Sequence, residues 1–159
     1  MSKKFPAILI CIVALLSTLL FPAVHTTKSE PASGEWTYQV DLLLTTKEAN
    51  GNTFKYGEET GTWSGTFTGT SFDFFELVAH PSGFVTCQGL IDFTGTVNGV
   101  SGTMIIKFIG KKTGDPLLWS GTWVIISGTG GLANLRGRGT WWGPSLDLDY
   151  SGNIHFDPS

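Results

Sequence analysis

A glycine-rich stretch in the second half of the chain has the spacing of a nucleotide-binding turn. Gly128, Gly130 and Ala133 follow an apolar run in the order G-x-G-x-x-A, the alanine variant of the dinucleotide-binding fingerprint. Such a turn holds a pyrophosphate only when it opens a helix whose N-terminus faces the phosphates. Gly137 and Gly139 follow closely, and each would cost a helix about 1 kcal/mol. The sequence therefore predicts a turn between strands here and no dinucleotide site.

The carboxylates are the next candidates, because a pair of them can perform acid–base chemistry. Glu76 differs from the others, since it lies in "SFDFFELVA", where both faces of a strand would be apolar. We expect its side chain to point inward, and Arg136 and Lys107 are candidate partners for a buried carboxylate. The remaining acidic residues are expected on solvated surfaces: Glu58, Glu59, Asp73, Asp92, Asp147 and Asp149.

Metal and nucleophile motifs are lacking from the sequence. His25, His80 and His155 are isolated and form no H-x-H or HExxH pattern, which predicts no metal site. Cys87 is the one cysteine after the first 26 residues. No serine lies in a G-x-S-x-G elbow. We therefore assign no catalytic residue and expect no cofactor.

Aromatic side chains recur on the apolar faces of the expected strands. A barrel of about eight strands is just wide enough to be filled by side chains, so core packing is the default interpretation. The functional alternative is a pocket for one apolar ligand at the barrel mouth. Together with Glu76, the candidate lining residues are Tyr38, Trp63, Trp119, Trp123 and Trp141.

Strands must position these side chains, because the dominant period after Glu35 is two. Trp36, Tyr38 and Val40 alternate with polar residues, as in a strand with one buried side. An Asn-Gly turn within residues 48–52 predicts a hairpin. Further turns are expected at 80–83 and 98–102, and a loop at 110–116. The expected strands cover residues 35–45, 54–67, 72–79, 85–93, 104–108, 117–125, 135–142 and 146–156.

About eight strands on short turns predict an all-β domain, closed as an antiparallel barrel because closure removes exposed edges. For the last hairpin, a two-residue turn at Gly143 and Pro144 would place Arg138 opposite Asp149. Such a cross-strand ion pair contributes about 0.2–1 kcal/mol.

The composition and the first residues set the class of protein. The 159 residues suit one domain, and a net charge of -3 without a basic stripe argues against a nucleic-acid partner. Lys3 and Lys4 precede an apolar run over 5–24, which predicts a secretory signal or an uncleaved membrane anchor over 1–26. We expect a linker over 27–34, a β domain over 35–159, and an extracytoplasmic location with membrane contact only through the N-terminal segment.

A longer motif around the glycine turn resembles a known family. "SGTGGLANLRGRGTW" (127–141) is similar to the late signature of the family called domain of unknown function 3224. "FTGTVNGVSGTMIIKFIG" (93–110) and "LDLDYSG" (146–152) resemble two of its other segments. The resemblance implies an eight-stranded barrel of the allene-oxide-cyclase and dirigent type. It implies no activity and transfers no catalytic residue.

Three hypotheses for function follow. The first is an exported, non-enzymatic barrel that binds a small apolar ligand or a surface partner, and the second is a cyclase or isomerase of the allene-oxide-cyclase type. The third is a structural or interaction module with a filled barrel. An interior pocket holding an inward carboxylate would favour the second, and a filled interior with an exposed aromatic patch would favour the third. The sequence leaves open whether the domain forms homo-oligomers.

Overall fold

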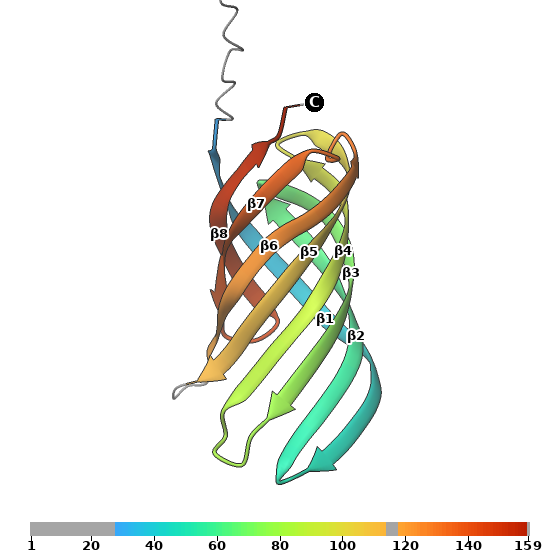
Figure 1. Cartoon of the computed structure of the whole chain (residues 1–159), viewed down its shortest axis with the longest axis vertical. Coiled ribbons are helices and arrows are strands. Elements are labelled where there is room, and N and C mark those ends of the chain that lie inside the picture. The colour runs from blue at the N-terminus through green and yellow to red at the C-terminus, as the bar shows by residue number, and fades with distance from the viewer. Residues whose placement is uncertain (1–27, 114–117, 159) are drawn as a thin grey trace, which may run out of the picture.

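Eight antiparallel strands form the described part of the chain, residues 28–113 and 118–158 of a computed structural model. Each strand pairs with its neighbours in sequence, and the last pairs with the first, so the sheet closes into a ring (Figure 1). The all-β prediction with eight antiparallel strands is confirmed. The strands are β1 (Glu30–Ala49), β2 (Asn52–Gly65), β3 (Phe67–Ala79), β4 (Val85–Val97), β5 (Val100–Thr113), β6 (Leu118–Gly130), β7 (Leu135–Gly143) and β8 (Asp147–Phe156).

The start of the sheet differs from the expected boundary. β1 begins at Glu30, so residues 30–34 of the expected linker are part of the ring, where Ala32 is buried and pairs with Gly152 on β8. The segment with its expected signal or anchor, 1–26, lies outside the described residues. Several other boundaries also differ: Phe67 begins β3 instead of ending β2, residues 110–113 of the expected loop belong to β5, and β6 runs on to Gly130.

The expected register of the last hairpin is wrong. Asp149 pairs with Trp142, and Arg138 pairs with Asn153, so the predicted Arg138–Asp149 ion pair does not form. The turn is longer than two residues, and its Leu146 carbonyl accepts a hydrogen bond from the Tyr38 backbone N–H at 2.9 Å. Because side chains alternate with a period of two, a shift by an even number of residues keeps every side chain on its face. The alternation in the sequence therefore could not distinguish the two registers.

The hairpin turns that the Asn-Gly pairs predicted are present. Asn50 and Gly51 join β1 to β2 with φ values of 50° and 76°, and Asn98 and Gly99 join β4 to β5 with 49° and 82°. Positive φ at both central residues is the geometry that matches the twist of a tight hairpin. These turns place consecutive strands side by side.

Aromatic side chains fill the part of the interior nearest the chain termini. Phe67 stacks on Tyr150 at 4.9 Å between ring centroids, and Trp36 stacks on Trp63 at 5.1 Å. The Tyr150 hydroxyl accepts a hydrogen bond from the Phe67 N–H at 2.8 Å and donates one to the Ser64 carbonyl at 3.1 Å. Tyr150 thereby links β8 to the segment around the β2–β3 turn, in addition to the β1–β8 pairing that closes the ring.

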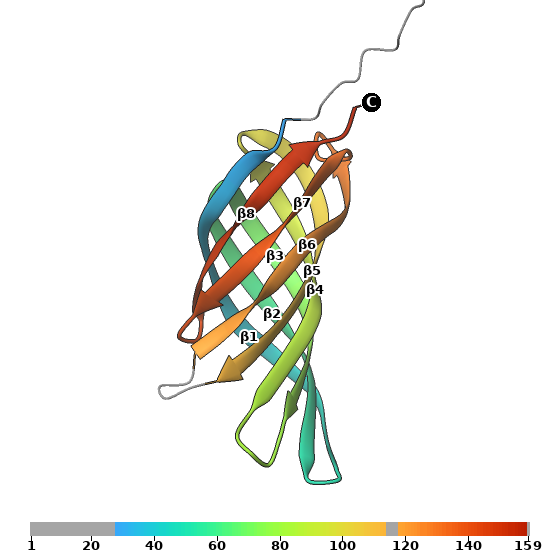
Figure 2. The same cartoon turned by 60° about the vertical axis from the view of Figure 1, so that its left-hand side comes forward.

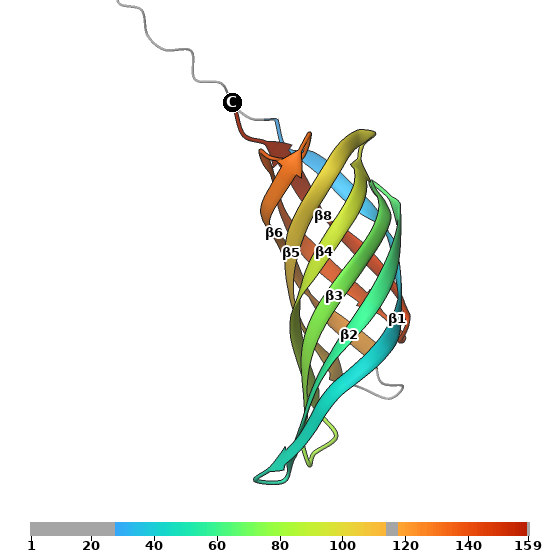
Figure 3. The ribbon, with the colours of Figure 1, turned by 90° about the vertical axis from the view of Figure 1, so that its right-hand side faces the viewer.

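The opposite end of the ring is uneven. β1 pairs with β8 only as far as Thr37 but with β2 as far as Ala49, so the second half of β1 has no pairing with β8. The β1–β2 and β3–β4 hairpins extend beyond the ends of β6, β7 and β8 (Figures 2 and 3). The inner face of the sheet is therefore less covered at this end, which is where the candidate site lies.

Candidate functional site

A small cavity occupies the interior toward the uneven end of the ring. Its volume is about 80 Å³, and Val40, which lines it, is 49% exposed, so the cavity reaches the surface there. Each of the eight strands contributes at least one lining residue, and most of the lining side chains are aromatic. The lining residues are Trp36, Tyr38, Val40, Glu59, Phe75, Cys87, Phe108, Trp119, Trp141 and Leu148.

Glu59 is the one carboxyl group among these lining residues. It lies on β2, opposite Val40 on β1 and Asp73 on β3, and it is only 5% exposed. Among the described residues, none forms a hydrogen bond or ion pair with its carboxyl group within normal bonding distance. Burial, and secondly the negative charge of Asp41, raise the pKa of Glu59 to about 7. This carboxyl group can therefore gain or lose a proton near neutral pH.

Asp73 forms a second buried carboxyl beside Glu59. Its side chain is fully buried, and Oδ2 accepts a hydrogen bond from the Ser71 hydroxyl at 3.2 Å, which in turn accepts one from Trp63 Nε1 at 3.0 Å. Oδ1 has no partner among the described residues. Burial and then the charge of Glu59 raise the pKa of Asp73 to about 8, against the lowering effect of the Ser71 hydrogen bond. The pair therefore carries less than two negative charges at neutral pH.

Two further ionisable groups border the cavity, and both stay neutral. Burial, followed by the charge of Glu59, raises the pKa of the Cys87 thiol to about 12. The same two causes raise the pKa of Tyr38 well above its ordinary value. Because a thiolate is the reactive form of cysteine, Cys87 is not poised as a nucleophile. At this site, only the carboxyl groups of Glu59 and Asp73 exchange protons near neutral pH.

The aromatic walls of the cavity meet at steep angles. Trp36 lies at 81° to Trp141, with 6.4 Å between ring centroids, and at 65° to Phe108. Trp141 also contacts Trp119 at 6.2 Å, and the ammonium of Lys112 lies 5.4 Å from the centre of the Trp119 ring. Ring faces and edges therefore alternate around the cavity, and a cation already rests on one of the rings.

Five of the predicted lining residues are inside the ring, and one is not. Tyr38, Trp119 and Trp141 line the cavity, whereas Trp63 and Trp123 are packed in the filled core. The expectation that Glu76 points inward is wrong, because it is exposed on the outer face. Its carboxylate accepts a hydrogen bond from Gln88 Nε2 at 2.8 Å, and no hydrogen bond or ion pair joins it to Arg136 or Lys107. Side chains alternate along β3, so the odd-numbered neighbours of Glu76, such as Asp73 and Phe75, face inward instead.

The inward carboxyls were detectable from the same alternation. Glu59 shares its parity with Trp63, and Asp73 shares its parity with Phe67 and Phe75. The flanking outward residues Phe72 and Phe74 masked this pattern, because they are apolar although they are exposed. Sequence reasoning thus assigned the wrong face of β3 to the interior.

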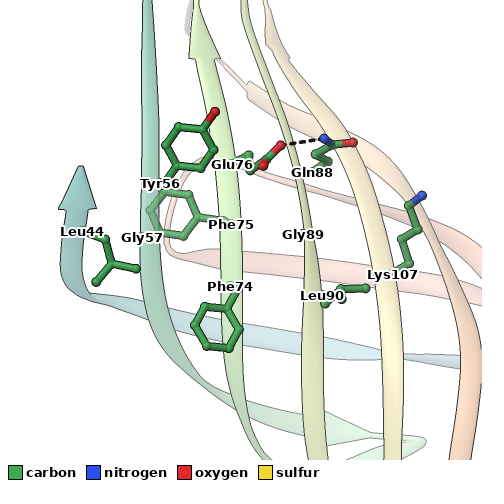
Figure 4. Close-up of a pocket in the computed structure, with 10 residues that line it drawn as sticks. All are labelled: Leu44, Tyr56, Gly57, Phe74, Phe75, Glu76, Gln88, Gly89, Leu90 and Lys107. Carbon is green, nitrogen blue, oxygen red and sulfur yellow. Dashed lines mark hydrogen bonds between the residues drawn. The ribbon is translucent and has the colours of Figure 1, made fainter. Parts of the chain in front are cut away.

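An apolar groove on the outer face lies over the same strands (Figure 4). Its volume is about 480 Å³, and its polar pair, Glu76 and Gln88, is satisfied internally. Phe72 and Phe74 pack edge to face beside it at 5.2 Å. Both charged residues of the groove, Glu76 and Lys107, are exposed. The groove therefore offers an apolar surface but no buried ionisable group for catalysis. The groove is lined by Leu44, Tyr56, Gly57, Phe74, Phe75, Glu76, Gln88, Gly89, Leu90 and Lys107.

Residues 28–113 and 118–158 contain neither a metal site nor a membrane-spanning helix. No group of three or more His, Cys, Asp or Glu side chains there is arranged to hold a metal ion. His80 Nδ1 lies 2.9 Å from Asn52 Oδ1, and His155 lies 3.2 Å from Asp157, so both imidazoles have local partners. In this part of the chain no helix has the length and apolarity needed to cross a bilayer.

Comparison with known proteins identifies relatives without an assigned activity. Residues 33–143 match the family described as "Protein of unknown function (DUF3224)". A solved structure of a DUF3224-family protein of unknown function from Shewanella oneidensis MR-1 matches with a TM-score of 0.66 and 15% sequence identity. The match covers 83% of this chain and 100% of that one. At this identity the likeness concerns the fold alone. The search of curated proteins found no match.

Proposed function

The chain belongs to the DUF3224 family, which has no assigned activity, and we propose that it binds one small ligand of largely apolar surface in the interior cavity. The observation that carries this proposal is the unpartnered, buried Glu59 in an aromatic-lined cavity that opens at Val40. Burying a carboxyl group without a partner costs several kcal/mol. A sheet that only needed a filled core would gain stability from an apolar residue at this position.

The size of the cavity limits the ligand. About 80 Å³ is well below the roughly 300–1,000 Å³ of pockets that enclose drug-sized molecules. A single water needs about 10–15 Å³ by a similar measure. The cavity therefore suits a group of a few heavy atoms, which is either the whole ligand or the end of a longer one that emerges at Val40.

Two probes of the same shape test this proposal, 3,3-dimethylbutan-1-ol and choline. We expect saturation-transfer NMR to detect binding of at least one of them to the full chain. Val40→Trp should block the opening and abolish binding. Val124→Trp is the matched control, since Val124 is also partly exposed but lies on the outer face, away from the cavity. Binding of neither probe, or equal binding by Val40→Trp and the native chain, would refute the proposal.

A second candidate function is proton transfer on the bound ligand, as in an isomerase. It is supported by the pKa of Glu59, about 7, because a general base works best when its pKa lies near the operating pH. The Glu59 carboxylate would take a proton from carbon beside a carbonyl group and return a solvent proton to it. Acetone in deuterium oxide is a small probe: we expect faster deuterium incorporation with the native chain and the background rate with Glu59→Gln. A background rate with the native chain would exclude this function.

We also propose that the protein is exported. The support is the apolar run over residues 5–24 after Lys3 and Lys4, a pattern typical of secretory signals and N-terminal anchors. Expression of the full chain followed by cell fractionation should place it outside the cytoplasm. N-terminal sequencing of the mature protein distinguishes a cleaved signal from a retained anchor, and recovery of the intact chain in the cytoplasmic fraction would contradict export.

A further inference from the structure

Aromatic rings from several strands line one small space. Trp36, Phe108 and Trp141 come from β1, β5 and β7, and their planes lie at 65° to 81° to one another. Because aromatic faces carry negative potential, rings that meet at steep angles can surround a positively charged group. The walls of the cavity thus have the chemistry of an aromatic cage.

The ionisable groups that face this cage are mostly acidic. β1 contributes Tyr38 and the nearby Asp41, β2 contributes Glu59, β3 contributes Asp73, and β4 contributes Cys87. The lining residues on β6, β7 and β8 carry no charge. The exception is on β5, where the ammonium of Lys112 lies at 5.4 Å from the centre of the Trp119 ring. This contact places an ammonium group over a ring of the cavity wall.

The charges around the cavity favour some classes of ligand head group over others. An anionic head would be repelled by Glu59 and Asp73, and a neutral head would leave the Glu59 carboxyl desolvated and unpaired. A bare metal ion would need a set of oxygen, nitrogen or sulfur ligands that the described residues do not bring together. An alkylated ammonium has both an apolar surface for the rings and a positive charge for the carboxyl group.

We propose that the head group bound in this cavity is a small alkylated ammonium, held by the rings of Trp36, Phe108, Trp119 and Trp141 and paired with Glu59. The inference rests on the proposed function and adds the chemical class of its ligand. Asp73 adds a second carboxyl group next to Glu59, because the two residues are paired between β2 and β3. Val40 marks the side from which the head group enters.

Choline and 3,3-dimethylbutan-1-ol separate charge from shape, because they differ in having a quaternary nitrogen or a quaternary carbon. Near pH 8, we expect titration calorimetry to give choline a dissociation constant about tenfold lower or better, as cation–π and ion-pair contacts imply. Glu59→Gln should remove most of this preference. Glu76→Gln is the matched control, since that carboxylate is exposed on the outer face. It should leave the preference unchanged.

Lys112→Met provides an independent readout. It keeps the length of the side chain and removes a cation that competes for the same ring, so choline should bind at least as tightly as it does to the native chain. Weaker choline binding by Lys112→Met would overturn the inference, because removing a competing positive charge should not weaken a cation that the rings and Glu59 hold. Equal affinities of the native chain for choline and its carbon analogue would also overturn the inference while leaving the proposed function intact. If neither probe binds, the proposed function fails as well.

Discussion

Replacing Asp73 by asparagine is expected to change how the free energy of unfolding depends on pH. Burial raises the pKa of Asp73 from its ordinary value of 3.8 to about 8. Between these values the folded protein keeps a proton that the unfolded chain has lost, so the native state becomes less stable as the pH rises. The loss begins near pH 4 and is complete above about pH 8. Glu59 acts in the same direction, since its pKa rises from 4.5 to about 7.

The magnitude for Asp73 is large compared with the stability of an ordinary domain. One pKa unit corresponds to about 1.4 kcal/mol, and integrating the proton uptake between pH 5 and pH 9 gives a loss of about 4 kcal/mol. Typical domains have about 5–15 kcal/mol in total. The native protein should therefore be most stable in mildly acidic solution and unfold at much lower urea concentration near pH 9.

Asparagine keeps the shape of Asp73 and its acceptor for the Ser71 hydroxyl, but it cannot ionise. Urea unfolding followed by tryptophan fluorescence between pH 5 and pH 9 should show a flatter profile for Asp73→Asn, with most of the remaining slope due to Glu59. Asp149→Asn is the control, because Asp149 is exposed on the outer face, and it should keep the native profile. A native stability that is constant or increases from pH 5 to pH 8 would refute the reasoning. So would the same pH dependence in Asp73→Asn and the native chain.

Three further outcomes are expected. Tyr150→Phe leaves the buried Phe67 N–H without its acceptor, so urea unfolding should show a loss of about 1–3 kcal/mol; an unchanged midpoint would mean that this hydrogen bond does not stabilise the fold. Cys87 should react with iodoacetamide far more slowly at pH 8 in the folded protein than in urea, because burial raises the pKa of its thiol to about 12; equal rates would contradict the buried position. A double-mutant cycle at Arg138 and Asp149 should give a coupling energy near zero, since Arg138 pairs with Asn153; a clear coupling would restore the shorter hairpin turn.

Local chemistry in the sequence was enough to predict the strands and several turns. Alternation of apolar and polar residues with a period of two indicates a strand wherever one face is buried, as in residues 36–40. The Asn-Gly pair at Asn50 and Gly51 indicates a hairpin because both residues adopt positive φ readily. Together these signals predicted an all-β fold of eight antiparallel strands, and the family resemblance followed from the glycines at 128–139.

The candidate site depended on choices that local pattern does not contain. Alternation determines which side chains share a face, but where both faces are apolar, as around Phe74, only closure of the ring decides which face is inside. Closure of the ring places Glu76 on the outer face of β3 and Asp73 on its inner face. Register is likewise decided by pairing between distant segments, which aligned Glu59 with Asp73. The cavity exists because β1 leaves β8 after Thr37, a consequence of strand lengths across the whole ring. Composition and period therefore specify the sheet, whereas the burial and pairing of its two carboxyl groups arise only when the eight strands close.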